Sequence, residues 1–71
     1  MDKGATLIVL ERLKRGTSQK DFAAEHGIYI GTFGRIEKRR LVGNKEVREK
    51  IASALGGKVE DFFDPETGLA L

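Results

Sequence analysis

The chain has 71 residues, a charged fraction of 34% and a formal net charge of +2, which predicts one small, mostly helical domain. It has no cysteine and a single histidine, so disulfide frameworks, zinc fingers and thiol catalysis are excluded, and we expect no metal and no cofactor. The apolar run "ATLIVL" at 5–10 is far shorter than the roughly 20 residues that span a bilayer, and "ERLKRG" follows it where a signal peptide would have a cleavage site. We therefore expect a cytoplasmic protein with no membrane partner and no small-molecule ligand.

The first helix is expected over about 5–15, ending at Gly16. On a helical wheel Val9, Leu10 and Leu13 share a face flanked by Leu7, which predicts that this stripe points into the core. Ile8 lies off the stripe.

A second helix opens at "TSQKDFAAE" with Ser18 as its N-cap. Phe22 and Ala23 are expected to face inward, and Gly27 to end the helix in a left-handed conformation. A third helix is expected over about 29–38. The i, i+3 and i+4 spacing of Tyr29, Phe33 and Ile36 predicts that these three share its buried face. The opposite face then carries Gly31, Thr32, Gly34, Arg35 and Lys38.

The fourth helix is expected over about 45–55 with Asn44 as its N-cap, and a final short turn over "KVEDFF" at 58–63. Because Gly57-Lys58 offers no good cap, this last helix is expected to start loosely. The tail "ETGLAL" has too little patterning for a structure to be assigned. We therefore expect one domain over residues 1–64 and a tail over 65–71.

Positive charge is concentrated in one part of the chain. Within residues 35–45 lie five cations, opposed only by Glu37: Arg35, Lys38, Arg39, Arg40 and Lys45. Such a cluster permits nucleic-acid binding, although a charge run by itself is most often only a solvated face. Two short helices joined through Gly27 also describe a helix-turn-helix, but spacing alone leaves an ordinary helical interaction bundle equally open.

A set of short motifs adds to this reading: "RGTSQKDFA" at 15–23, "GI" at 27–28, "T" at 32, "RIEK" at 35–38, "KIASALG" at 50–56 and "VEDFF" at 59–63. In this order and spacing, residues 7–63 resemble the phage repressor/Cro helix-turn-helix family. The resemblance implies an all-α domain of five short helices, with the helix-turn-helix in helices 2 and 3. It also implies binding to double-stranded DNA, often as a homodimer on paired half-sites.

The resemblance also implies roles for single residues. Gln19 matches a position that contacts a phosphate or an outer base, and Ile30, Gly31 and Arg35 match positions that approach base edges. Lys38, Arg39 and Arg40 match the stretch that meets the DNA backbone. Arg12 and Glu37 match a pair that in some members forms an ion pair between the first and third helices; otherwise they are two independent surface charges worth little to stability.

At positions 30, 31 and 34 the family often has polar side chains, whereas this chain has Ile30, Gly31 and Gly34. Each of the two glycines also costs a helix about 0.8–1.0 kcal/mol relative to alanine. One explanation is that they let the helix backbone sit deep in the groove. Arg35 then reads a guanine, and Ile30 or Thr32 lies against a thymine methyl. The other explanation is that the bare face no longer reads bases and accepts a protein.

We favour DNA because basic side chains line the groove side of this helix, whereas a protein-binding face would more often carry apolar or aromatic anchors. The sequence thus predicts a non-enzymatic, sequence-specific transcriptional regulator that binds double-stranded DNA, with the recognition helix at about 29–38 in the major groove. The alternative is a protein-interaction module, such as an antirepressor or antitoxin-like partner, on the same fold.

Overall fold

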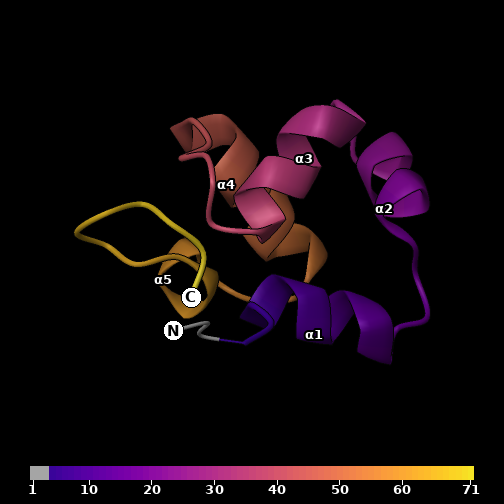
Figure 1. Cartoon of the computed structure of the whole chain (residues 1–71), viewed down its shortest axis with the longest axis horizontal. Helices are drawn as coiled ribbons and strands as arrows, with labels where there is room; N and C mark the ends of the chain where they lie inside the picture. Colours follow the sequence, from indigo (N-terminus) through magenta and orange to yellow (C-terminus); the bar gives the residue numbers. More distant parts are fainter. Residues whose placement is uncertain (1–3) are drawn as a thin grey trace.

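The computed structural model describes residues 4–71 and contains five α-helices in that range, with no strand beyond one isolated bridge (Figure 1). The all-α prediction is therefore confirmed. The helices are α1 (Leu7–Lys14), α2 (Gln19–Glu25), α3 (Ile30–Glu37), α4 (Lys45–Ala54) and α5 (Val59–Phe62). Within the described residues, none of these helices has the length and apolar character that a membrane crossing requires.

Local capping fixes where the helices begin and end. Ser18 Oγ accepts from the Asp21 amide at 3.1 Å, and Asn44 Oδ1 accepts from the Val47 amide at 2.8 Å, as expected from the sequence. Gly27 ends the turn after α2 in the left-handed region with φ 65°, also as expected. The loose start expected for α5 is wrong, because the Lys58 amide donates to Asp61 Oδ2 at 2.8 Å and fastens the first turn.

The core lies between all five helices and is built mainly from phenylalanine and isoleucine. Phe33 is fully buried and stacks on Phe22 with ring centroids 4.8 Å apart, which joins α2 to α3. The core cluster comprises Ile8, Phe22, Ala23, Ile28, Phe33, Ile36, Ile51, Ala52, Leu55, Phe62, Phe63 and Ala70. The expected burial of Phe22, Ala23, Phe33 and Ile36 is thus confirmed.

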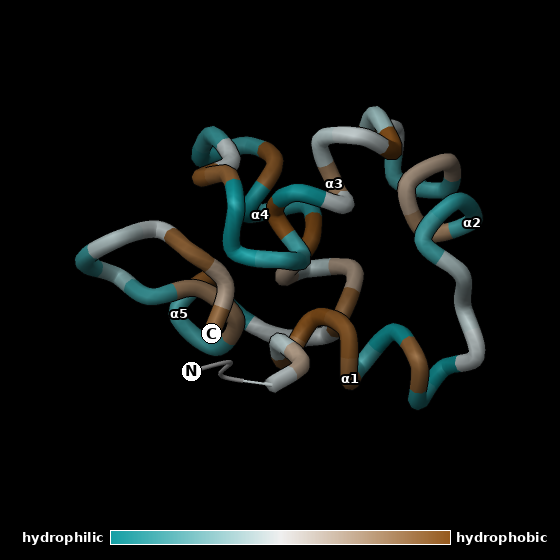
Figure 2. Tube along the Cα trace, viewed as in Figure 1, coloured by the Kyte–Doolittle hydropathy of each residue, from teal (hydrophilic) through white to brown (hydrophobic). Residues whose placement is uncertain are grey.

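The prediction of which face of α1 is buried is wrong. Ile8 is fully buried and Arg12 nearly so, whereas Leu7, Leu10 and Leu13 are 41%, 52% and 61% exposed. Residues 8 and 12 lie one turn apart on the same face, so once both point inward the leucines must point outward. This is why α1 is coloured as hydrophobic over much of its length and yet lies at the edge of the molecule (Figure 2).

The tail that the sequence left unassigned is packed against the rest of the chain. Ala70 is buried and forms an antiparallel bridge with Phe63. The Leu71 amide donates to the Phe62 carbonyl at 2.9 Å, and the Leu71 carbonyl accepts from the Leu7 amide at 2.8 Å. Residues 65–71 therefore join α1 to α5 (Figure 1).

Candidate nucleic-acid interface

Helices α2 and α3 pack against each other and are joined by the short segment 26–29 (Figure 1). The Ile28 amide donates to the Ala23 carbonyl at 2.9 Å, and Ile28 is buried beneath the turn. With Phe33 and Ile36 also buried, α3 is anchored by one face, while Ile30 and Arg35 are exposed on the rest of the helix. A helix held in this way can enter a groove that is wide enough to admit it.

Three cations lie exposed at the C-terminal end of α3 and just beyond it. Arg35, Lys38 and Arg40 are all exposed, and within residues 4–71 no hydrogen bond or ion pair engages their side chains. The Arg40 amide donates to the Arg35 carbonyl at 2.8 Å, so the chain turns back and keeps these residues close. Their charges are therefore available to an anionic partner.

The single acid of this region, Glu37, contributes no negative charge to that surface. Its side chain is 1% exposed and forms a two-pronged ion pair with Arg12, at 2.6 Å from Nε to Oε2 and 3.2 Å from Nη2 to Oε1. The Thr6 hydroxyl donates to the Glu37 carbonyl at 2.8 Å. The ion pair between α1 and α3 that the resemblance implied is thus present, and the one acid within residues 35–45 is buried rather than exposed beside the cations.

Gln19 takes part in the same network. Its Nε2 donates to Glu37 Oε1 at 2.6 Å, so the amide nitrogen expected to contact DNA is used inside the protein. Gln19 also lines a shallow surface groove together with Lys20 and Ile30, so α2 and α3 present side chains to one common surface. Of the residues expected near base edges, Ile30 is 44% exposed and Thr32 is half-buried.

The prediction that Tyr29 is buried is wrong. Its ring lies on the surface and contacts Gly31. Tyr29 is 76% exposed, and a Cβ atom built on Gly31 would lie 2.7 Å from its Cε2 atom. The phenol ring therefore lies over Gly31. Tyr29 has extended backbone at the N-cap of α3, with φ −62° and ψ 129°, so the helical spacing that groups Phe33 with Ile36 does not extend to it.

Gly34 has different surroundings from Gly31. The nearest side-chain atoms to an added Cβ would be those of the Gln19 amide, at 3.9 Å, which is ordinary van der Waals contact. Nothing in the described part of the protein therefore requires glycine at position 34, whereas the Tyr29 ring occupies the space at position 31. The sequence suggested that no side chain covers the outward face of α3 at Gly31 and Gly34. In the structure this holds at Gly34, but the Tyr29 ring covers Gly31.

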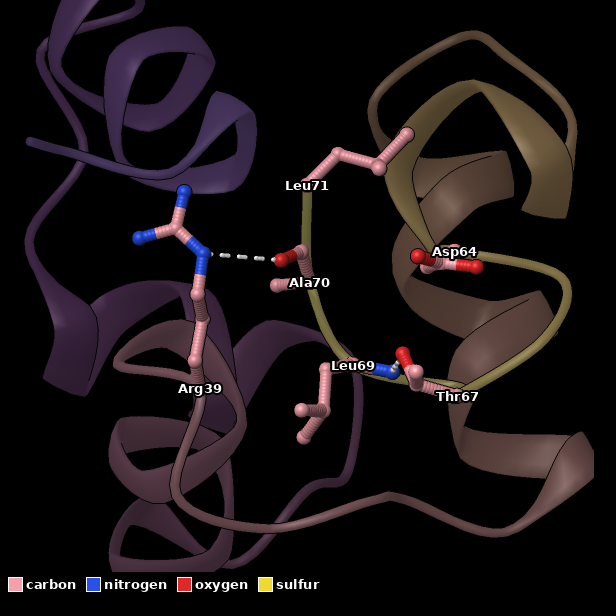
Figure 3. A pocket seen from close by; sticks show the side chains of 6 residues that line it. All are labelled: Arg39, Asp64, Thr67, Leu69, Ala70 and Leu71. Carbon is pink, nitrogen blue, oxygen red and sulfur yellow. Dashed lines mark hydrogen bonds between the residues drawn. The ribbon is translucent and has the colours of Figure 1, made fainter. Parts of the chain in front are cut away.

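Arg39 is turned away from the candidate interface. Its Nε donates to the Ala70 carbonyl at 3.0 Å and its Nη1 to the Gly4 carbonyl at 3.1 Å. Figure 3 shows the side chain reaching toward the C-terminal segment, beside a cleft of about 280 Å³ lined by Asp64, Thr67, Leu69, Ala70 and Leu71. Its φ of 62° places it in the left-handed region that favours glycine. Arg39 therefore has hydrogen-bond partners inside the fold, and the DNA contact expected for it stays a prediction.

No three acidic or histidine side chains within residues 4–71 come together in a way that would hold a metal ion. No protein-family model, curated protein or solved structure matches the chain. The residue that sequence reasoning missed is Tyr29, and its signal was its place directly before the first helical residue, where a side chain leaves the helical register.

Proposed function

We propose that the chain is a sequence-specific double-stranded DNA-binding transcriptional regulator whose α2 and α3 act as a helix-turn-helix, with α3 in the major groove. The observation that carries the proposal is the surface at the end of α3. Arg35, Lys38 and Arg40 are exposed and unengaged there, while Glu37 is buried and neutralised by Arg12. A surface of cations without acids attracts the phosphate backbone and releases its counterions.

The proposal divides the contacts by position. Arg35 lies within α3 and reads base edges, its guanidinium donating in two places to guanine. Lys38 and Arg40 lie beyond the helix and meet phosphates, which positions the protein without carrying sequence information. Cations near the C-terminal end of a helix are also favoured by its dipole, so this arrangement is compatible with the stability of α3.

The test is fluorescence anisotropy of a mixed-sequence DNA duplex across a salt series. The logarithm of the binding constant is expected to fall linearly with the logarithm of salt concentration, with a slope of about −0.9 per phosphate neutralised. Lys38→Ala should reduce the magnitude of this slope by about one contact. The matched control is Lys14→Ala on α1, whose side chain is 78% exposed on another helix and should leave the slope unchanged.

One observation favours the alternative of a protein-interaction module: the exposed leucines Leu7, Leu10 and Leu13 on α1. They lie on a different helix from the cations at the end of α3. A wild-type chain that shows no salt-dependent duplex binding would replace the DNA proposal with this alternative. If binding is found, a protection footprint on the DNA flanking its own gene gives the site, and one or two protected half-sites give the number of bound copies.

A further inference from the structure

Tyr29 and Gly31 lie against each other at the N-terminal end of α3. Tyr29 is 76% exposed, its side chain forms no capping hydrogen bond, and it is not one of the buried residues of the core cluster. A Cβ on Gly31 would lie at 2.7 Å from Tyr29 Cε2, 3.3 Å from Cδ2 and 3.4 Å from Cζ. The ring thus rests on the helix at the one place where the absence of a side chain makes room for it.

The absence of a side chain at position 31 costs helix stability, and the ring, which is 76% exposed, buries little area in return. The ring therefore stands on the outer surface of α3, where it is accessible to a molecule outside the protein. Next to it lies Ile30, also partly exposed. The two side chains make the N-terminal end of α3 apolar, whereas the C-terminal end is cationic at Arg35 and Lys38.

We propose that Tyr29, seated on Gly31, is a specificity-determining residue that packs its ring against the methyl group of a thymine in the major groove. This inference rests on the proposed DNA-binding function. The thymine methyl is the apolar group that base edges present in the major groove, and apolar side chains recognise thymine through it. This contact uses the ring and does not require the phenol hydroxyl. It therefore differs from a hydrogen bond that the hydroxyl would donate to a phosphate.

The test compares thymine with deoxyuridine, which lacks only the methyl group. Duplexes selected by the wild-type chain from a randomised DNA library are resynthesised with deoxyuridine at one thymine at a time, and affinity is measured at fixed salt. At the contacted thymine, loss of the methyl group should weaken wild-type binding about fourfold, equivalent to about 0.8 kcal/mol for one buried methyl-sized group. Tyr29→Ala should bind both duplexes equally, and Tyr29→Phe should keep the fourfold ratio.

Two glycine substitutions distinguish the effect of displacing the Tyr29 ring from the effect of a more stable helix. Gly31→Ala places a methyl group where the Tyr29 ring now lies, so the ring must move and the thymine-to-deoxyuridine ratio should fall as in Tyr29→Ala. Gly34→Ala makes the same chemical change on the same helix, but its nearest side-chain neighbour is at 3.9 Å and the ring is undisturbed. Its ratio should remain that of the wild type, whatever its effect on overall affinity. Circular dichroism of each variant verifies that the helices persist.

The outcomes are distinct. Absence of duplex binding by the wild-type chain overturns the proposed function itself. Binding in which every thymine methyl matters as much to Tyr29→Ala as to the wild type overturns only the role of Tyr29. A Tyr29→Phe variant that binds both duplexes with equal affinity would show that the ratio depends on the hydroxyl, and this would also overturn the methyl contact.

Discussion

The buried ion pair between Arg12 and Glu37 should govern the stability of this fold. Replacing Arg12 by methionine removes two of the three side-chain donors that reach the Glu37 carboxylate and leaves only the Gln19 amide at 2.6 Å. The carboxylate is 1% exposed, so water cannot replace the lost donors. Breaking a buried pair in this way costs about 3–5 kcal/mol, because one charge is left uncompensated.

That cost is large for a chain of this size. At about 0.05–0.15 kcal/mol per residue, 71 residues give a free energy of unfolding of roughly 4–11 kcal/mol. Arg12→Met should therefore remove about a quarter or more of the free energy of unfolding, measured by urea unfolding followed by circular dichroism at constant pH. Glu37→Leu should also be strongly destabilising, since it leaves the Arg12 guanidinium with the Thr17 carbonyl at 2.9 Å as its hydrogen-bond acceptor.

The stability of the double variant Arg12→Met/Glu37→Leu tests whether the loss in each single variant comes from an unpaired buried charge. The double variant contains no stranded charge, so it should be more stable than either single variant, as apolar replacements of buried pairs often are. The exposed pair Lys50–Glu46, at 3.8 Å on α4, provides the control, and Lys50→Ala should change stability by less than about 1 kcal/mol. If the two single losses simply add in the double variant, or if Arg12→Met costs no more than Lys50→Ala, the pair is not an isolated buried unit and the argument fails.

Three further predictions concern α3 and the segment that follows it. Gly34→Ala should raise the free energy of unfolding by about 0.8–1.0 kcal/mol, since alanine fits at 3.9 Å from Gln19; a lowered melting temperature would contradict this. Arg39→Gly and Arg39→Ala both lose the bonds to Ala70 and Gly4, but only glycine relieves the left-handed φ of 62°. Arg39→Ala should therefore be the less stable of the two by about 1–2 kcal/mol in chemical unfolding, and equal stabilities would show that the backbone there is not strained. Arg35→Ala should flatten discrimination at one or two base pairs in a selection experiment, whereas Lys38→Ala should weaken all sequences alike; an unaltered preferred site for Arg35→Ala would refute direct readout.

Local chemistry made the caps predictable from the sequence. Ser18, Asn44 and Gly27 each act through a side chain or a backbone conformation that neighbouring residues alone specify. The same holds for the inward positions Phe22 and Phe33, because the helices that carry them have one clear apolar face. These features required no knowledge of the tertiary structure.

The features that could not be predicted from the sequence depend on contacts with residues outside the local sequence pattern. The structure of residues 65–71 depends on bonds to Leu7, Phe62 and Arg39, none of which the tail itself signals. The seat of Tyr29 on Gly31 depends on a residue outside the helical register. Within the candidate site, the exposure of Arg35, Lys38 and Arg40 could be predicted because charged side chains rarely lie buried. The hydrogen bonds of Gln19 and Arg39 inside the fold could not, because their partners are distant in the sequence.

The wrong face predicted for α1 and the correct identification of its ion pair have the same cause. Hydrophobic periodicity places Leu10 and Leu13 inward only if every inward position is apolar. Glu37 is buried at the end of α3 and needs a cation, and Arg12 supplies it from α1. Once Arg12 faces inward, Ile8 follows one turn earlier and the leucines are forced outward. The electrostatic requirement of one buried carboxylate thus sets the register of a whole helix, and it also keeps Glu37 from opposing the exposed cations at the end of α3.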